Sequence, residues 1–489
     1  MTQPIASIDD SADATGEDAG AVLLSAARHA VAYRAAPRAC PQARASYAQS
    51  LAAFDGALPE HGDAAQQVLD ELVRHAGPGL PAVTGPRYFG WVIGNSHPVG
   101  VAADWLTAAW GQNAANHVAA PAAAAVETVA ARWLLELLRL PAESSVGFVT
   151  GATMASFVGL AAARGEVLRR VGWDVAAQGL FGAPPVRVMI GQEVHASVFS
   201  ALHYLGFGEA SLLRVPADAH GVMCPEAFEA LAARDLPPGA PLIVVTQLGH
   251  IHSGACDAHE RIVPRVHARG GWVHVDGAFG LWARACPARA GLALGAEGAD
   301  SWATDGHKWL QAPFDCGYAV VRDADAHRRA MTIAASYLPP VSAQERDPSH
   351  YVPELSRRAR GFATWALLRH FGRAGIAAMV ERHCAQARLL ADLLAAEPGI
   401  TVLNAVVLNQ IALRFGHDDD EVAGDGLTRA VIAGVQEGGI CFAGGAAWRG
   451  RWIMRLSVIG FSTRDDDIRL SARAIIAAWR RVASAAGAG

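Results

Sequence analysis

The stretch Asp305-Gly306-His307-Lys308-Trp309-Leu310 contains the only lysine in a chain of 489 residues. The chain has 41 lysine and arginine residues, so the other 40 are arginines. Arginine replaces lysine as a surface charge, but its guanidinium cannot become a nucleophilic amine. A single lysine at position 308 therefore indicates a need for a primary amine there. The alternative is that Lys308 has no function and is present by chance in a composition that favours arginine.

A primary amine is needed where a protein forms an imine with an aldehyde, above all with pyridoxal 5'-phosphate (PLP). PLP draws electrons from the substrate Cα into its ring, best when the pyridine nitrogen is protonated. A buried carboxylate is therefore expected beside that nitrogen. Asp276 suits this role because it ends the apolar run 271–275. The alternative for an aspartate in this position is a turn or helix N-cap residue.

Short apolar runs alternate with helical patterns over the middle of the chain. The runs are 146–149, 186–190, 212–215, 242–246, 272–275, 301–303 and 318–321. This alternation predicts an α/β fold with a mostly parallel sheet that is covered on both faces. Ligands of such sheets bind beyond the carboxyl ends of the strands. Thr153, His195, Asp276 and Lys308 all lie at or after the end of a predicted strand.

Four regions are expected along the chain. Residues 1–20 are polar and acidic and are interpreted as a disordered tail, and 21–100 as an N-terminal helical segment. Residues 101–373 form the predicted large PLP-binding domain, and 374–489 a small C-terminal α+β domain. Because the net charge is only −5 and no long apolar run or basic stripe occurs, neither a membrane span nor a nucleic-acid partner is expected. Seven scattered cysteines without a CxxC pair predict no metal site and favour a cytoplasmic location.

Two further segments suit a phosphorylated cofactor. Thr150-Gly151-Ala152-Thr153 lies between a predicted strand and a predicted helix, where backbone N–H groups bind phosphate. Such turns are common in α/β folds, so the turn alone is weak evidence. His195 follows another predicted strand, and its imidazole could stack on a pyridine ring. An ordinary polar loop residue is the alternative for one of 19 histidines.

Several segments together resemble the group II PLP-dependent decarboxylases, which include aromatic-L-amino-acid decarboxylase and glutamate decarboxylase. These segments are Asp276-Gly277-Ala278, 299–309, Asp315-Cys316-Gly317, 148–164, His195, 246–257, 356–360, 408–410 and 454–457. The resemblance covers about residues 85 to 475. It implies the fold of aspartate aminotransferase (fold type I), a homodimer with active sites at the subunit interface, and decarboxylation of an L-amino acid.

The resemblance also implies roles for individual residues. Lys308 resembles the lysine that forms the imine, Asp276 the partner of the pyridine nitrogen, and His195 the histidine stacked on the ring. The remaining positions are Ala278 on the opposite ring face, Ala152 and Thr153 at the phosphate, His307 near the phosphate and the reacting centre, and Ser253 near the ring substituents. Lys308, His195, Asp276 and His307 are the implied catalytic residues.

Two positions depart from the family pattern. Asp305 stands where many members have an asparagine that contacts the phosphate, and an anion there is unfavourable unless it is paired or turned away. Pro348 stands where the animal aromatic decarboxylases have a tyrosine that reprotonates Cα, and Tyr351 or His350 is a possible replacement. Without a proton donor, an oxidative reaction that forms an aldehyde competes with amine formation. The same scaffold also supports transamination and Cβ lyase reactions, and a PLP-fold binding protein without activity is a third class.

The substrate side chain is only partly indicated. Trp91, Val92 and Ile93 resemble the pocket wall of the family and favour an aromatic or apolar side chain, although ordinary core packing explains them nearly as well. His250 and His252 are either polar pocket residues or loop residues. Arg455 either binds a carboxylate or holds the small domain against the large one.

Overall fold

The computed structural model describes residues 19–36, 41–332, 345–416 and 421–487. A seven-stranded sheet in the order β1-β7-β6-β5-β4-β2-β3 forms the centre of its larger part. The strands are β1 (Ser145–Val149), β2 (Arg187–Gly191), β3 (Leu212–Val215), β4 (Leu242–Gln247), β5 (Trp272–Asp276), β6 (Ser301–Asp305) and β7 (Gly317–Val321). Strands β2 to β6 run parallel, and β7 is antiparallel to both of its neighbours, β6 and β1. The predicted α/β fold with a mostly parallel sheet is confirmed.

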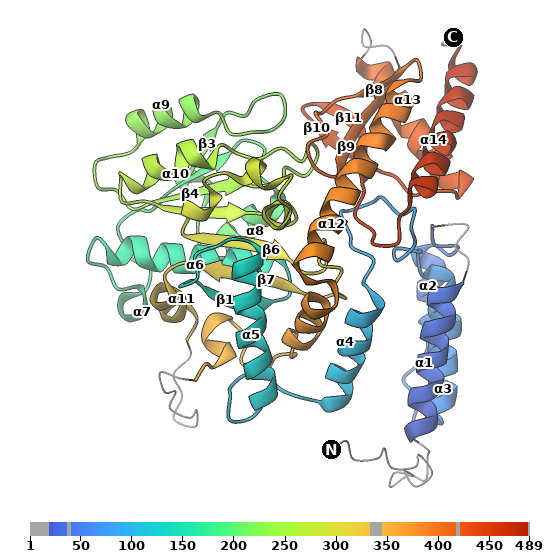
Figure 1. The fold of residues 1–489 in the computed structure, drawn as a ribbon, viewed down its shortest axis with the longest axis horizontal. Helices are drawn as coiled ribbons and strands as arrows, with labels where there is room; N and C mark the ends of the chain where they lie inside the picture. Colours follow the sequence, from blue (N-terminus) through green and yellow to red (C-terminus); the bar gives the residue numbers. More distant parts are fainter. Residues whose placement is uncertain (1–18, 37–40, 333–344, 417–420, 488–489) are drawn as a thin grey trace.

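Apart from the edge strand β3, nearly all strand residues are buried, because both faces of the sheet are covered. In β4 every residue is buried, and Val244 and Val245 belong to two separate apolar cores. One core includes α6 (Ala152–Arg169), α8 (Ala196–Tyr204) and α11 (Ala324–Met331). The other includes α5 (Pro121–Leu137), α9 (Pro225–Asp235), α10 (His259–His267) and the first part of α12 (Gly361–Ala395). Helices therefore cover both faces, as Figure 1 shows.

A second sheet, β10-β11-β9-β8, is antiparallel throughout. Its strands are β8 (Ile400–Val402), β9 (Gln410–Phe415), β10 (Gly444–Trp448) and β11 (Arg451–Ser457). Helix α13 (Glu421–Gly438), helix α14 (Asp465–Ala486) and the second part of α12 share an apolar core with it. This C-terminal part lies at the upper right of Figure 1, beside the carboxyl ends of the parallel strands.

Helix α12 joins the two parts of the molecule and corrects one expectation. The sequence pattern predicts a helix from Ser356, but the helix begins only at Gly361. The preceding backbone is held in a bridge between Arg358 and Asn113 instead. Within α12, Gly372 has φ +61°, a conformation that favours glycine, and the helix kinks there. The kink lies next to the expected boundary at residue 373, although the division into domains stays a prediction.

The N-terminal helices lie along one side of the molecule (Figure 1). They are α1 (Ala19–Ala35), α2 (Tyr47–Phe54), α3 (Ala65–Ala76) and α4 (Pro98–Trp110). Neither α2 nor α3 contains a buried residue. Nearly all of the predicted tail, residues 1–20, lies outside the described residues. Among the described residues, no helix is long and apolar enough to cross a membrane.

A buried ion pair fixes the segment before α12. Arg357 Nη1 lies 2.7 Å from Glu127 Oε1 of α5, and each side chain is 1% exposed. The guanidinium also donates to the carbonyls of Phe148 and Ala114. Because a buried carboxylate without its partner is costly, Arg357 is expected to contribute strongly to stability.

We expect Arg357→Met to lower the free energy of unfolding by about 3–5 kcal/mol, because it leaves the Glu127 carboxylate buried without its main partner. The adjacent Arg358 provides the control, since it pairs with Asp104 at 2.8 Å on the surface. Arg358→Met is expected to cost at most about 1 kcal/mol. Urea unfolding of both variants measures the difference, and equal losses would contradict the assignment.

Candidate active site

The carboxyl ends of β5 and β6 and the N-terminus of α6 bring the predicted amine and both carboxylates together. Lys308 follows β6 by three residues, and its Nζ lies 2.8 Å from Asp305 Oδ2. Its side chain is 16% exposed. Asp276 ends β5, is buried, and accepts a hydrogen bond from the Ala278 N–H at 3.2 Å. Burial raises the pKa of Asp276, and the positive charges of His195 and Lys308 act against that rise.

His195 caps the N-terminus of α8 and faces the same cleft. Its Nδ1 accepts hydrogen bonds from the backbone N–H and hydroxyl of Ser197, and its own backbone N–H donates to Gln247 Oε1 at 3.2 Å. The ring is open to solvent along one side, yet the surrounding protein atoms lower its pKa. Asp276 raises this pKa, whereas Lys308 lowers it. Gln247 pairs with Asp276 in the β4–β5 ladder, so the bond from His195 to Gln247 holds the histidine beside the strand end that carries the carboxylate.

The turn before α6 adjoins the lysine. Ala152, the first residue of α6, donates its backbone N–H to Asp305 Oδ1 at 2.6 Å. A Cβ on Gly151 would lie 3.1 Å from His307 Cε1 and 3.2 Å from Asp305 Oδ1, so a larger residue would crowd these two side chains. Thr153 is exposed in the first helical turn, where backbone N–H groups have no partner within the helix. The turn therefore offers donors for an anion.

The loop that carries Lys308 is held rigidly. His307 Nδ1 accepts from the Cys316 N–H, and its ring lies against Phe314 with centroids 4.4 Å apart. Burial lowers the pKa of His307. Trp309 is buried and donates from Nε1 to His383 Nδ1 at 3.0 Å. The amine is thus presented by a backbone that is fixed on both sides of it.

The segment Trp91–Ile93 reaches this loop through the following glycine, whose N–H donates to the His307 carbonyl at 3.2 Å. Val92 is buried in the core, whereas Trp91 is 65% exposed and Ile93 is half-buried. Trp91 and Val92 both have positive φ. Of the three predicted wall residues, Val92 thus has the position of a core residue.

A cavity of about 480 Å³ opens between His195 and the C-terminal sheet. Its lining includes Glu193, His250, His252, Trp448, Arg449 and Arg455. Arg455 has no hydrogen-bond or ion-pair partner among the described residues, and burial lowers its pKa. Burial also lowers the pKa of His250 to about 4 and that of His252 to about 3, so both rings are neutral near pH 7. Arg455 therefore brings an unpaired positive charge to a cavity with neutral imidazoles.

Glu193 and Trp448 were not expected at this site. Trp448 Nε1 donates to Glu193 Oε2 at 2.7 Å, and His250 Nε2 lies 3.4 Å from the same oxygen. These contacts join residues 255 positions apart in the chain. No local pattern in the sequence predicts these contacts.

A known family domain covers most of the chain. The family model described as "Pyridoxal-dependent decarboxylase conserved domain" matches residues 48–416. The chain belongs to the pyridoxal-dependent decarboxylase family. It is accordingly a PLP-dependent carboxy-lyase, as the resemblance implied.

This decarboxylase is 25% identical over 424 residues to phenylacetaldehyde synthase of Arabidopsis thaliana, covering 84% of this chain and 85% of that protein. It is 26% identical over 452 residues to aromatic-L-amino-acid decarboxylase of Sus scrofa, covering 88% and 89%. The structure of Oryza sativa TDC with PLP and tryptamine matches with a TM-score of 0.89 at 22% identity, covering 98% and 99% of the chains. Catharanthus roseus tryptophan decarboxylase with L-tryptophan matches with a TM-score of 0.85 at 17% identity, covering 95% and 99%. These structures confirm the predicted fold type I.

The residues of the decarboxylase fit PLP. Lys308 supplies the amine, and the turn at Gly151 has no Cβ to obstruct an anion. Asp276 is a buried carboxylate to which only a backbone N–H donates among the described residues, so a protonated ring nitrogen would satisfy its charge. Ala278 lies next to Asp276 and accepts from the Asp305 N–H at 2.9 Å. Its place beside both carboxylates suits a residue packed on the ring.

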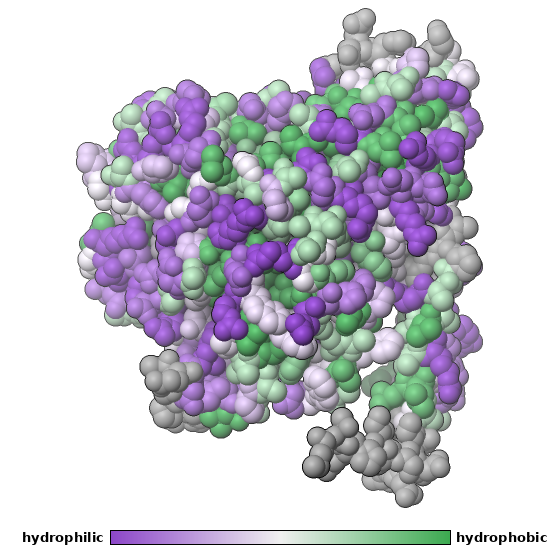
Figure 2. All heavy atoms as spheres, in the orientation of Figure 1, coloured by the Kyte–Doolittle hydropathy of each residue, from purple (hydrophilic) through white to green (hydrophobic). Residues whose placement is uncertain are grey.

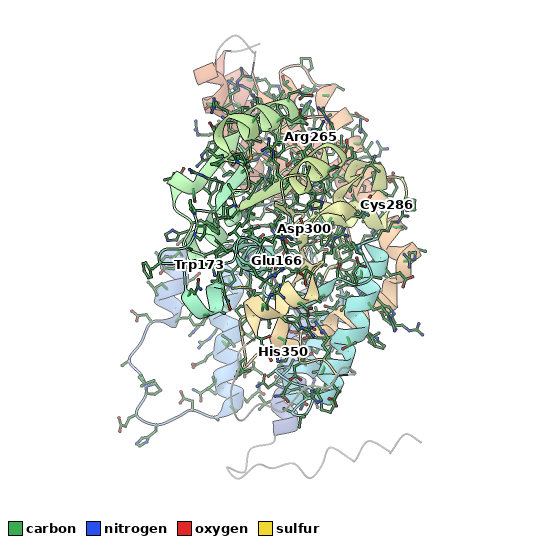
Figure 3. All side chains as sticks on the ribbon, turned by 90° about the vertical axis from the view of Figure 1, so that its left-hand side faces the viewer. Glu166, Trp173, Arg265, Cys286, Asp300 and His350 are labelled. Atoms are coloured by element: carbon green, nitrogen blue, oxygen red, sulfur yellow. The ribbon has the colours of Figure 1, made fainter. Side chains whose placement is uncertain are left out.

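Three residues of the decarboxylase lie apart from this group. Tyr351 is buried between β1 and α11, where Arg346 lies 4.3 Å from its ring and His327 donates to its carbonyl. His350, beside it, is labelled in the lower part of Figure 3. Ser253 donates to the His220 carbonyl at 2.6 Å and lies 3.2 Å from His250. The structure therefore places Ser253 with the histidine cluster, and it does not bring Tyr351 to Lys308 within one chain.

Proposed function

We propose that this decarboxylase removes the α-carboxylate of an L-amino acid with an aromatic or apolar side chain and releases the amine. The observation that carries the proposal is the grouping of the only lysine of the chain with Asp276 and His195 beyond parallel strands. When bound, PLP supplies an electron sink for the bond that breaks at Cα.

The residues of the chain prepare that chemistry. Lys308 would supply the amine that holds the cofactor aldehyde. Asp276 would keep a proton on the ring nitrogen, because a buried carboxylate is stabilised by a cation beside it. His195 would pack against the ring. Ala152 and Thr153 would hold the phosphate at the N-terminus of α6, with His307 beside them.

Arg455 is proposed to bind the substrate carboxylate. It is a half-buried guanidinium without a partner among the described residues, and it interacts electrostatically with His195. A cation that has lost part of its hydration without gaining a partner is stabilised when an anion reaches it. Because His250 and His252 are neutral, they can position the carboxylate through hydrogen bonds without competing for it.

An aromatic or apolar side chain is favoured by the exposed Trp91 and the half-buried Ile93 at the lysine loop. Relatives named tyrosine decarboxylase and aromatic-L-amino-acid decarboxylase support the same class. The odd number of cysteines without a CxxC pair supports a reducing compartment, the cytoplasm.

A homodimer is proposed because the N-terminal helices expose apolar side chains. The exposed residues of α1 to α4 include Leu23, Val31, Leu51, Phe54, Val68, Leu72, Trp105, Leu106 and Trp110. Apolar residues are visible along these helices at the lower right of Figure 2. Helices of this length gain stability chiefly from packing, and α2 and α3 bury nothing within one chain. A second copy of the chain that covers these faces would supply that packing.

One observation favours a second candidate, oxidation to an aldehyde. Pro348 has no proton to give at the position where a tyrosine is expected, and Tyr351 is buried away from the lysine. The overall reaction would convert the amino acid, dioxygen and water into aldehyde, carbon dioxide, ammonia and hydrogen peroxide. Phenylacetaldehyde synthase among the relatives is named for an aldehyde product.

Product analysis separates the two candidates. The purified protein is incubated with PLP and each of tyrosine, tryptophan, phenylalanine and glutamate, with Lys308→Ala as the blank. We expect carbon dioxide and amine in equal amounts from an aromatic substrate, without peroxide, because decarboxylation consumes no oxidant. Aldehyde with equal peroxide would establish the second candidate, and no turnover of any amino acid would contradict both.

We expect Arg455→Gln to weaken binding of the amino acid by about 10- to 100-fold, because a charge-assisted hydrogen bond to the carboxylate is lost. Binding of the corresponding amine, which has no carboxylate, should change little. Arg449 lines the same cavity and lies 3.5 Å from Glu193, so Arg449→Gln is the matched control. Spectral titrations with both ligands measure the effect, and an equal loss for the amine would exclude this role.

A further inference from the structure

Asp305 places a buried carboxylate at the N-terminus of α6. That helix end is the one proposed to bind the cofactor phosphate. Its Oδ1 accepts the Ala152 N–H at 2.6 Å, and its Oδ2 lies 2.8 Å from Lys308 Nζ. His307 Nε2 lies 3.4 Å from Oδ1. The side chain is only 3% exposed. Asp305 is thus paired, but its partners are the groups that the cofactor itself requires.

The backbone of Asp305 prevents it from leaving this position easily. Its N–H donates to the Ala278 carbonyl at 2.9 Å, and its own carbonyl accepts from Trp282 Nε1 at 3.0 Å. Asp305 also pairs with Gly317 in the β6–β7 ladder. Because the main chain is held on both sides, only a rotation of the side chain could move the carboxylate.

We propose that Asp305 acts as an internal competitor of the cofactor phosphate and so limits how much that phosphate contributes to binding. The inference rests on the proposed use of α6 as the phosphate site. A phosphate on the first turn of α6 shares the helix end with the carboxylate and repels it, because both are anions in a partly buried place. Ala152 has one N–H to donate, and Asp305 already accepts it.

The ion pair with Lys308 adds a second consequence. The amine must leave Asp305 Oδ2 before it can attack an aldehyde, since the ion pair orients Nζ toward the carboxylate. The ion pair with Asp305 therefore weakens imine formation by Lys308 equally for every aldehyde cofactor. Repulsion by the Asp305 carboxylate, in contrast, weakens the binding only of a cofactor that carries a phosphate. The two effects are separable with a cofactor that lacks phosphate.

The test compares PLP with pyridoxal, which has the same aldehyde and ring but no phosphate. Equilibrium affinities are measured from the absorbance that each aldehyde develops with Lys308 in the full-length protein. We expect Asp305→Asn to raise the preference for PLP over pyridoxal at least about tenfold, because one like charge near the phosphate is removed. Asp305→Ser is expected to act in the same direction and serves if the first variant folds poorly, as judged by circular dichroism.

Asp300 offers a matched control at the opposite end of the same strand. Its Oδ2 also accepts a backbone N–H, from Val273 at 2.7 Å, and lies 2.9 Å from His267 Nε2. Figure 3 labels Asp300 on the side of the molecule that faces away from the C-terminal sheet. Asp300→Asn is expected to leave the preference for PLP within about twofold of the wild-type value, because the carboxylate lies at the end of β6 remote from the N-terminus of α6.

The outcomes are distinguishable. If PLP and pyridoxal both bind through Lys308 and the two Asp305 variants leave their affinity ratio unchanged or lower it, the competition is excluded while the cofactor assignment stands. If neither aldehyde binds to the wild-type protein, the proposed function fails first. A rise in the ratio with Asp300→Asn as large as with Asp305→Asn would also overturn the proposal, because the effect would then be one of net charge.

Discussion

The parallel pairing of β5 with β6 is the constraint on which the site depends. Asp276 lies opposite Ala303 in this ladder, and the Gly277 N–H continues it by donating to the Ala303 carbonyl. The pairing aligns the ends of the two strands, so the carboxylate of one lies next to the loop that carries Lys308. A shift of one residue would turn Asp276 to the other face of the sheet. The large apolar side chains on the two faces, Trp302 on one and Trp272 on the other, make such a shift costly.

The charges of the site follow from this alignment. Asp305 is satisfied by a helix N–H and an ammonium, whereas only a backbone N–H donates to Asp276 among the described residues. Burial raises the pKa of Asp276. A cationic ring nitrogen would remove that penalty. Arg455, on the other side of the cleft, is a cation without a partner among the described residues, and an anionic group would stabilise it.

The sequence predicted those features that depend on local composition. Each strand of the large sheet was visible because burial on both faces leaves a continuous apolar run, as in β4. Lys308 could be predicted as a functional residue because no other lysine occurs in the sequence. Strand β10 was missed, since Gly444 and Gly445 have no side chain that favours a strand. The contact of Glu193 with Trp448 joins distant segments, and no local pattern encodes it.

The roles of individual residues were less predictable than the fold. The motif around Lys308 marks Asp305 as unusual. Its partners, however, depend on how α6 packs against β6, which the sequence alone does not show. The position of Tyr351 in the chain suggests a role as proton donor, yet its ring packs with Arg346. The early start expected for α12 failed because the Asn113 side chain accepts the Arg357 N–H and the backbone bridge to Arg358 follows. In each case tertiary contacts override a local preference.

The central claim is that one amine holds the cofactor aldehyde, and the composition of the chain makes this directly measurable. Borohydride reduction of the protein with bound PLP, followed by peptide mass mapping, locates the attached group. The account predicts one phosphopyridoxyl group per chain, on the peptide that contains Lys308. Attachment only at the N-terminal amine, or no attachment, would contradict it.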